Sequence, residues 1–171
     1  NSPWLHEAAT EPIRAAGGLR LRLMPYLYTL MGQAAREHRP VLRPTFFHFP
    51  DDARCWHDND EMMVGADLLV APVFQPGQRE RTLYLPRGAH APGWYDLRTG
   101  EYLPGGAEVT VSAVLDSLPL FVRAGALLPT TDTPHHDALT EEVSRALCYF
   151  PAPPGNGPAS SVAELFEDDG L

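Results

Sequence analysis

The sequence predicts a mainly β fold: an antiparallel β-sandwich preceded by one long helix. The first reason is proline, which makes up 18 of 171 residues, about twice the usual share, and which breaks helices from inside. The second is that short runs of Val, Leu, Phe and Tyr alternate with Pro and Gly from residue 41 onward, as in strands joined by turns. The hydrophobic share of 44% is enough for a buried core.

The helix comes first along the chain. Apolar residues recur every three or four positions over residues 13–35, with a second apolar stripe beside them, so we expect a helix buried on more than one side. Thr10 is the expected N-cap, and Pro12 fits the first turn. Pro25 lies inside the helix and should kink or divide it, and the helix should end shortly before Pro40.

Strands are expected over the rest of the chain, and their number and short spacing indicate a sandwich. Gly100 suits a tight hairpin over residues 98–100. Residues 108–111 alternate with period two, which places one face in the core and one in water. The expected strands are 41–49, 67–73, 81–85, 94–97, 108–114, 120–123 and 126–128, and, after a linker at 130–137, 143–150 and 161–166.

Charge and length exclude several classes of protein. The net charge is −9, with 13 basic residues, all Arg, against 22 acidic ones, which disfavours a nucleic-acid or anionic-membrane surface. No apolar run reaches the roughly 20 residues of a membrane span. Two cysteines form no disulfide framework, so both are expected to be reduced, and a cytoplasmic location is slightly favoured while the compartment stays open. The chain starts without Met and stops after a turn, so we expect a segment of a longer protein.

An acidic stretch between residues 48 and 61 is the first candidate site. Carboxylates and imidazoles at such density could ligate a metal, but the spacing fits neither an EF-hand nor a zinc helix. We expect a solvated loop with Arg54 as internal counter-charge, no metal and no cofactor; a metal-dependent domain is an open alternative. Cys55 beside His57 makes a poor nucleophile, because nearby acids raise a thiol's pKa. The stretch contains His48, Asp51, Asp52, His57, Asp58, Asp60 and Glu61.

Aromatic residues around the predicted hairpin are the second candidate. Trp94, Tyr95 and Tyr102 could stack on the C–H faces of sugars. Neighbours on a strand point to opposite faces, however, so we expect Trp94 in the core. A self-standing sugar-binding module remains an alternative function.

Several segments, in one order along the chain, resemble glycoside hydrolase family 31, the α-glucosidase/α-xylosidase family. The segment from Leu19 to Leu30, "LRLRLMPYLYTL", is similar to the family's "LRYRLLPYLYTL", and "ELFEDDG" from Glu164 to Gly170 is similar to "FELYEDDG". No single segment is decisive, but together they cover nearly the whole chain. The other matching segments are 41–44, 46–52, 60–73, 84–86, 94–96 and 118–126.

The resemblance implies a division of the chain. Residues 1–39 would be the last loop and helix of a (β/α)₈ catalytic barrel, residues 40–133 the proximal C-terminal sandwich, and residues 134–171 the beginning of a distal β domain. The helix and the sandwich would pack on the barrel within the same molecule.

It also implies a function. Family members are retaining enzymes that cleave α-linked glycosides and oligosaccharides with two aspartates, usually about 5–5.5 Å apart. Both aspartates would lie upstream of Asn1, so no residue here is expected to be catalytic. Trp4 belongs to a Pro-Trp pair that resembles the one in the final active-site loop, so it is the one expected substrate contact, at the rim of the pocket; packing of Trp4 at the entrance of the helix is an open alternative.

Overall fold

The computed structural model describes the chain except for residues 1–6, 58–59, 133–143, 155–160 and 169–171. The chain forms two compact units. One unit, here the helical unit, holds residues 1–41, 127–148 and 162–171, and the other, the sandwich unit, holds residues 42–126 and 149–161. The units are interleaved along the sequence, and the domain boundaries expected at residues 39 and 133 stay a prediction.

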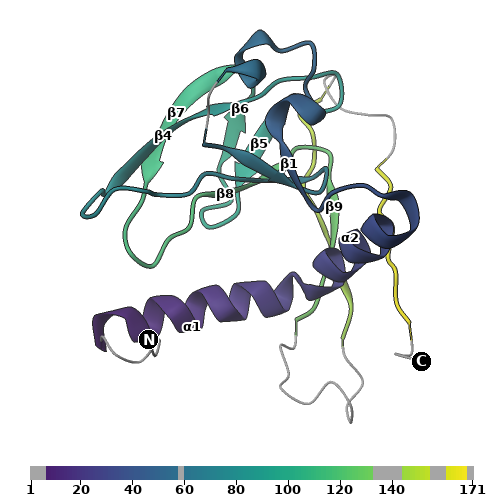
Figure 1. The fold of residues 1–171 in the computed structure, drawn as a ribbon, viewed down its shortest axis with the longest axis horizontal. Helices are drawn as coiled ribbons and strands as arrows, with labels where there is room; N and C mark the ends of the chain where they lie inside the picture. Colours follow the sequence, from purple (N-terminus) through teal and green to yellow (C-terminus); the bar gives the residue numbers. More distant parts are fainter. Residues whose placement is uncertain (1–6, 58–59, 133–143, 155–160, 169–171) are drawn as a thin grey trace. The chain divides into compact units, whose positions relative to one another are not determined.

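Two helices occupy the predicted helical region (Figure 1): α1 (Glu7–Arg22) and α2 (Met24–Glu37). The predicted break is confirmed, because Leu23 separates the helices and Pro25 lies in the first turn of α2, where its missing N–H costs no hydrogen bond. The predicted N-cap at Thr10 is wrong, since α1 is already helical at Glu7. Neither helix is long and apolar enough to cross a membrane, within the described part of the chain.

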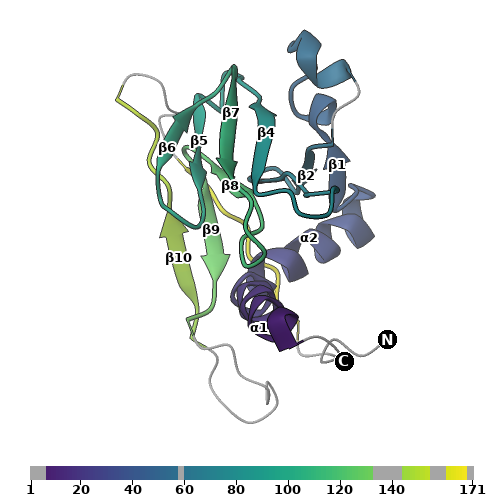
Figure 2. The same cartoon turned by 90° about the vertical axis from the view of Figure 1, so that its left-hand side faces the viewer.

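Burial differs between the two helices. α1 has no buried residue, so the expected burial on more than one side is not seen there. α2 buries residues of one face and packs against β9 (Leu127–Thr130). β9 pairs in turn with β10 (Ala146–Tyr149), beside it in Figure 2.

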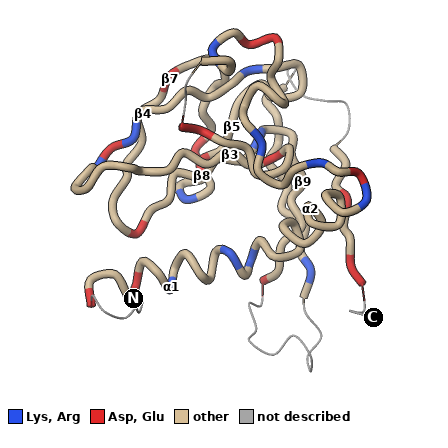
Figure 3. The backbone as a smooth tube through the Cα atoms, in the orientation of Figure 1, with Lys and Arg blue, Asp and Glu red and all other residues tan. Residues whose placement is uncertain are grey.

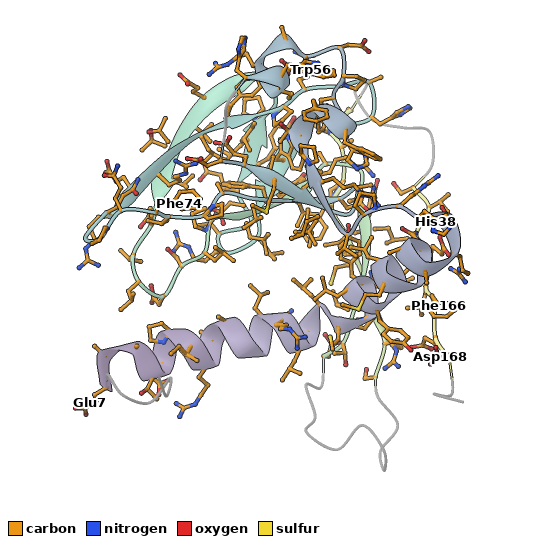
Figure 4. All side chains as sticks on the ribbon, in the orientation of Figure 1. Glu7, His38, Trp56, Phe74, Phe166 and Asp168 are labelled. Carbon is orange, nitrogen blue, oxygen red and sulfur yellow. The ribbon has the colours of Figure 1, made fainter. Side chains whose placement is uncertain are left out.

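The expected strand at residues 161–166 is wrong. The described residues 161–168 form no strand, and residues 164–168, which we call the C-terminal segment, lie along α2. The backbone N–H of Phe166 donates to Thr29 Oγ1 at 3.0 Å, and the Phe166 ring stacks on Tyr28 with centroids 5.8 Å apart. Figure 4 shows Phe166 and Asp168 beside this helix.

Polar contacts fasten the same segment to α2. Glu164 accepts hydrogen bonds from Gln33 Nε2 at 2.8 Å and Arg36 Nη2 at 2.9 Å. Tyr28 donates its hydroxyl to Asp168 at 2.7 Å. The C-terminal segment is therefore tied to three successive turns of the helix.

Two antiparallel sheets build the sandwich unit. The larger sheet has the strand order β1-β2-β3-β8-β5-β6, and the smaller pairs β4 (Glu80–Leu85) with β7 (Ala107–Ser112), side by side in Figures 1 and 2. The strands of the larger sheet are β1 (Leu42–Pro44), β2 (Met62–Val64), β3 (Leu68–Val70), β5 (Gly93–Asp96), β6 (Tyr102–Pro104) and β8 (Leu120–Arg123).

One hydrophobic core joins the two sheets. Trp94 of β5 and Phe121 of β8 are fully buried, together with Leu83 and Leu85 of β4. The indole N–H of Trp94 donates to the carbonyl of Pro86 at 2.8 Å, so its one polar atom is satisfied inside the core. The antiparallel sandwich predicted from the sequence is thus confirmed.

Individual strands agree with the sequence to different degrees. The strands expected at 81–85 and 120–123 are confirmed, and Gly100 has the positive φ (73°) that the predicted hairpin requires. The strand expected at 41–49 is wrong beyond Pro44, where the chain turns into the short 3₁₀ helix η2 (Thr45–Phe47). β2 was not predicted, because it directly follows the acidic stretch.

Candidate functional site

Trp4, the expected substrate contact, lies outside the described residues. Its role at a pocket rim stays a prediction. The remaining candidates all belong to the sandwich unit.

Within the acidic stretch, Asp52 has a structural role. Its Oδ1 accepts the backbone N–H of Arg54 at 3.1 Å, which caps the 3₁₀ helix η3 (Ala53–Trp56). Its Oδ2 accepts the Tyr84 hydroxyl of β4 at 2.7 Å. Burial and this hydrogen bond raise the pKa of Tyr84 to about 12. The carboxylate therefore fastens η3 to the smaller sheet.

Two further acids of the stretch share a cation. Arg81 Nη2 lies 3.5 Å from Asp60 Oδ2 and 3.6 Å from Glu61 Oε1. Both acids border an open depression of about 440 Å³, whose apolar side includes Leu42 and Phe74. The depression is completed by Arg43, Pro44 and Met62.

Metal binding gains no support from this geometry. Over the ranges that the structure describes, no group of three His, Cys, Asp or Glu side chains could hold a metal ion; Asp58 falls outside those ranges. Arg43 Nη1 donates to His48 Nε2 at 2.9 Å, so this ring nitrogen is occupied. Burial, followed by the Arg43 charge, lowers the pKa of His48.

Cys55 is a core residue. It is the buried residue of η3, and burial raises the pKa of its thiol to about 11, with a smaller contribution from the nearby acids. A thiol that stays protonated at neutral pH is a weak nucleophile.

The hairpin aromatics form no exposed platform. Trp94 is in the core, as predicted. Tyr95 donates its hydroxyl to the Pro151 carbonyl at 2.8 Å, and its ring meets Tyr102 edge-on with centroids 5.4 Å apart. Both tyrosines are therefore used in packing within the unit.

An exposed pair of stacked rings was not predicted from the sequence. Phe46 of η2 and Trp56 of η3 lie with centroids 4.7 Å apart and planes 13° from parallel. Trp56 is 60% exposed, and Figure 4 shows it at one end of its unit, well away from Phe74. The sequence signal was two aromatic residues flanking a Pro-Asp-Asp turn, but the pairing depends on how that turn folds back.

Charges around these features are mixed. Figure 3 shows acidic and basic positions interspersed along the described backbone.

A protein-family comparison identifies the sandwich. The model for the glycosyl hydrolase family 31 C-terminal domain matches residues 38–128, which include β1 to β8.

Relatives in sequence extend the similarity beyond this domain. Alpha-glucosidase 2 of Bacillus thermoamyloliquefaciens is 37% identical over 152 residues, 89% of this chain and 18% of that protein. An alpha-xylosidase of Saccharolobus solfataricus is 35% identical over 153 residues, 90% of this chain and 20% of that protein. The chain thus spans about one fifth of the length of these relatives.

Solved structures of family 31 enzymes are similar to this chain in fold. A family 31 dextranase of Flavobacterium johnsoniae in complex with isomaltotriose superposes with a TM-score of 0.79 at 29% identity, over 88% of this chain and 18% of that one. A family 31 alpha-xylosidase from a soil metagenome, in complex with xylose, gives a TM-score of 0.66 at 40% identity, over 72% and 18% of the two chains.

Proposed function

The chain belongs to glycosyl hydrolase family 31 and carries its C-terminal domain, and on that premise we propose that the whole protein hydrolyses α-linked glycosides with retention. Residues 1–171 would be a structural portion of this enzyme. The observation that carries the proposal is the match of the family's C-terminal domain to residues 38–128, the residues that form most of the sandwich.

The substrate class follows from the relatives. Proteins similar to this chain are named as an alpha-glucosidase and an alpha-xylosidase, and structural neighbours hold isomaltotriose or xylose. Glucosides, xylosides and their oligosaccharides joined by α-linkages are therefore the proposed substrates.

A non-catalytic role is supported by what the carboxylates contact. Retaining hydrolysis uses two carboxyl groups about 5–5.5 Å apart on either side of the scissile bond. Asp52 binds a backbone N–H and a phenol, Asp67 binds the Arg123 guanidinium at 2.6 Å, and Glu61 neighbours Arg81. These acids hold elements of the sandwich unit together.

The exposed apolar residues of the helices support a packing role. Ile13 of α1 and Met24 and Met31 of α2 are exposed although they belong to the predicted apolar stripes. A stripe of this kind is typical of a helix that packs on another element. We propose that the catalytic barrel covers it in the whole enzyme.

The test compares the whole protein with residues 1–171 alone. The whole protein should release the aryl group from an aryl α-glucoside or α-xyloside, with the newly formed sugar initially in the α configuration. The 171-residue chain should match a protein-free blank. Turnover by the short chain would refute its structural role, and inactivity of the whole protein on all such substrates would refute the proposed activity.

A further inference from the structure

The Phe46–Trp56 pair has the properties of a ligand contact. We propose that this pair, on the connection between β1 and β2, is a surface on which neutral sugar chains stack. The inference goes beyond the proposed function, because it assigns a binding surface to residues of this chain itself; only the choice of an α-glucan as ligand rests on the proposed function.

The indole is held in one orientation. Its Nε1–H donates to the Pro50 carbonyl at 2.8 Å, and Phe46 stacks on the ring with planes 13° from parallel. The ring's only polar group is thereby used within the protein, while the side chain remains 60% exposed. An oriented ring loses little conformational entropy when a ligand stacks on it.

The turn beneath the ring is firmly anchored. Asp52 links it to Tyr84, and Arg54 forms an ion pair with Glu108 at 2.7 Å while lying 4.3 Å above the Tyr84 ring centroid. Cys55, next to Trp56, is buried in the core. These contacts tie η3 to both β4 and β7, which gives the ring the rigid base that a binding site requires.

The size of the surface favours a sugar over a protein. Trp56 is 60% and Phe46 36% exposed, which leaves on the order of 200 Å² of aromatic surface. A stable protein interface buries about 800 Å² on each partner. One or two sugar rings would cover an area that matches the exposed aromatic surface of the pair.

The residues next to the pair in the sequence also favour a sugar. Asp51, which follows the residue that accepts the indole N–H, is exposed, and so is His57 beside Trp56. A carboxylate accepts hydrogen bonds from sugar hydroxyls, whereas it repels phosphate or another anion. A neutral polyol with C–H faces therefore suits both the aromatic pair and the exposed polar residues that neighbour it in the sequence.

Residue-level footprinting of the whole protein tests the proposal. Hydroxyl radicals should oxidise Trp56 in free protein, and dextran or maltoheptaose should lower that oxidation several-fold. Sugars also scavenge hydroxyl radicals, so the readout is the ratio of Trp56 oxidation to that of Phe74, which is 61% exposed on the same unit; binding should lower this ratio several-fold. Trp56 that is unreactive without sugar is covered by another part of the protein, and either this result or a ratio that sugar leaves unchanged would overturn the proposal.

Substitution supplies an independent readout. The whole protein and its variants are run in native gels containing dextran or amylopectin. The polysaccharide should retard Trp56→Ala about fivefold less than it retards wild type, in keeping with the loss of one stacking contact. Trp56→Phe should keep most of the retardation, and Phe74→Ala all of it. Equal retardation of Trp56→Ala and wild type would overturn the proposal.

The outcomes also separate this proposal from the proposed function. Whole protein that fails to cleave α-glycosides but shows sugar protection of Trp56 contradicts only the enzymatic proposal. Whole protein that cleaves α-glycosides but shows no sugar protection of Trp56 contradicts only the proposed sugar-binding surface.

Discussion

α1 and α2 come from one continuous apolar pattern, yet they differ in what covers them. α2 buries five residues and packs against β9 and the C-terminal segment, whereas α1 buries none. The predicted apolar stripes run through both helices, and the two helices differ in the partners that the rest of the chain supplies. An apolar stripe in a sequence indicates that a helix packs against another element, but that element can lie in another part of the protein.

The contacts of Phe166 account for part of this difference. Its ring stacks on Tyr28, lies 4.4 Å beneath the Arg36 guanidinium carbon and sits against Gly32. The sequence of α1 contains no aromatic residue on which such a ring could stack. Removing the Phe166 ring is the most direct way to make α2 resemble α1.

The largest expected effect is that of Phe166→Ala. Loss of the ring should lower the local stability of α2 by about 2–3 kcal/mol, since it removes aromatic stacking and a packed side chain. Hydrogen–deuterium exchange of peptides from α2 should accelerate, while those from β4 and β7 stay unchanged. Val162→Ala, at a position 87% exposed, is the matched control and should leave α2 as it is; equal exchange in both variants would show that the ring does not hold the helix.

Alanine at helix glycines should have opposite effects in the two helices. A Cβ at Gly32 of α2 would lie 2.6 Å from Phe166 Cδ1, so Gly32→Ala should destabilise the protein by about 1–2 kcal/mol. A Cβ at Gly17 of α1 would meet no atom within 4 Å, so Gly17→Ala in the 171-residue chain should stabilise by up to about 1 kcal/mol. Urea unfolding midpoints measure both.

The same two variants can be compared in the whole protein. If the barrel packs on α1, the stabilisation by Gly17→Ala should shrink or reverse there, while the destabilisation by Gly32→Ala persists. A Gly17→Ala gain of equal size in both proteins would mean that α1 stays uncovered.

The smallest effect concerns the Tyr28–Asp168 hydrogen bond. This bond, more than burial, raises the pKa of Tyr28. Because the folded-state pKa is raised, the bond contributes fully below the unfolded value of about 10, and its contribution is lost as the pH rises through the folded value. Tyrosinate absorbance near 295 nm should show Tyr28, identified by difference from Tyr28→Phe, titrating at lower pH in Asp168→Asn than in wild type. Identical titrations would mean that the carboxylate does not act on the phenol.

Much of the fold follows from local sequence signals. Pro25 predicted the helix break because proline has no N–H to donate, and strand parity placed Trp94 in the core while sending its neighbour Tyr95 to the other face. The errors arose where a distant partner decides. The segment at 161–166 has the composition of a strand, but the backbone N–H of Phe166 binds Thr29 on α2, and local sequence does not show that partner.

The candidate sites were harder to predict for the same reason. The acidic residues could be found in the sequence, but their roles depend on Tyr84 and Arg81, which β4 brings to them. The pairing of Phe46 with Trp56 depends on the fold of the turn between them. The role of Trp4 remains a prediction.

The interleaving of the two units constrains how this region can be exchanged between proteins. The chain passes between units after residues 41, 126, 148 and 161, and Phe150 returns to the sandwich unit through hydrogen bonds with Gly125 (2.6 Å) and Ala126 (3.0 Å). A cassette that ends at residue 126 would lose these bonds, and one that continues to residue 161 must carry β9 and most of β10 from the other unit. No single boundary in this region therefore isolates the sandwich unit. We expect chimaeras between relatives to fold only when they exchange both units.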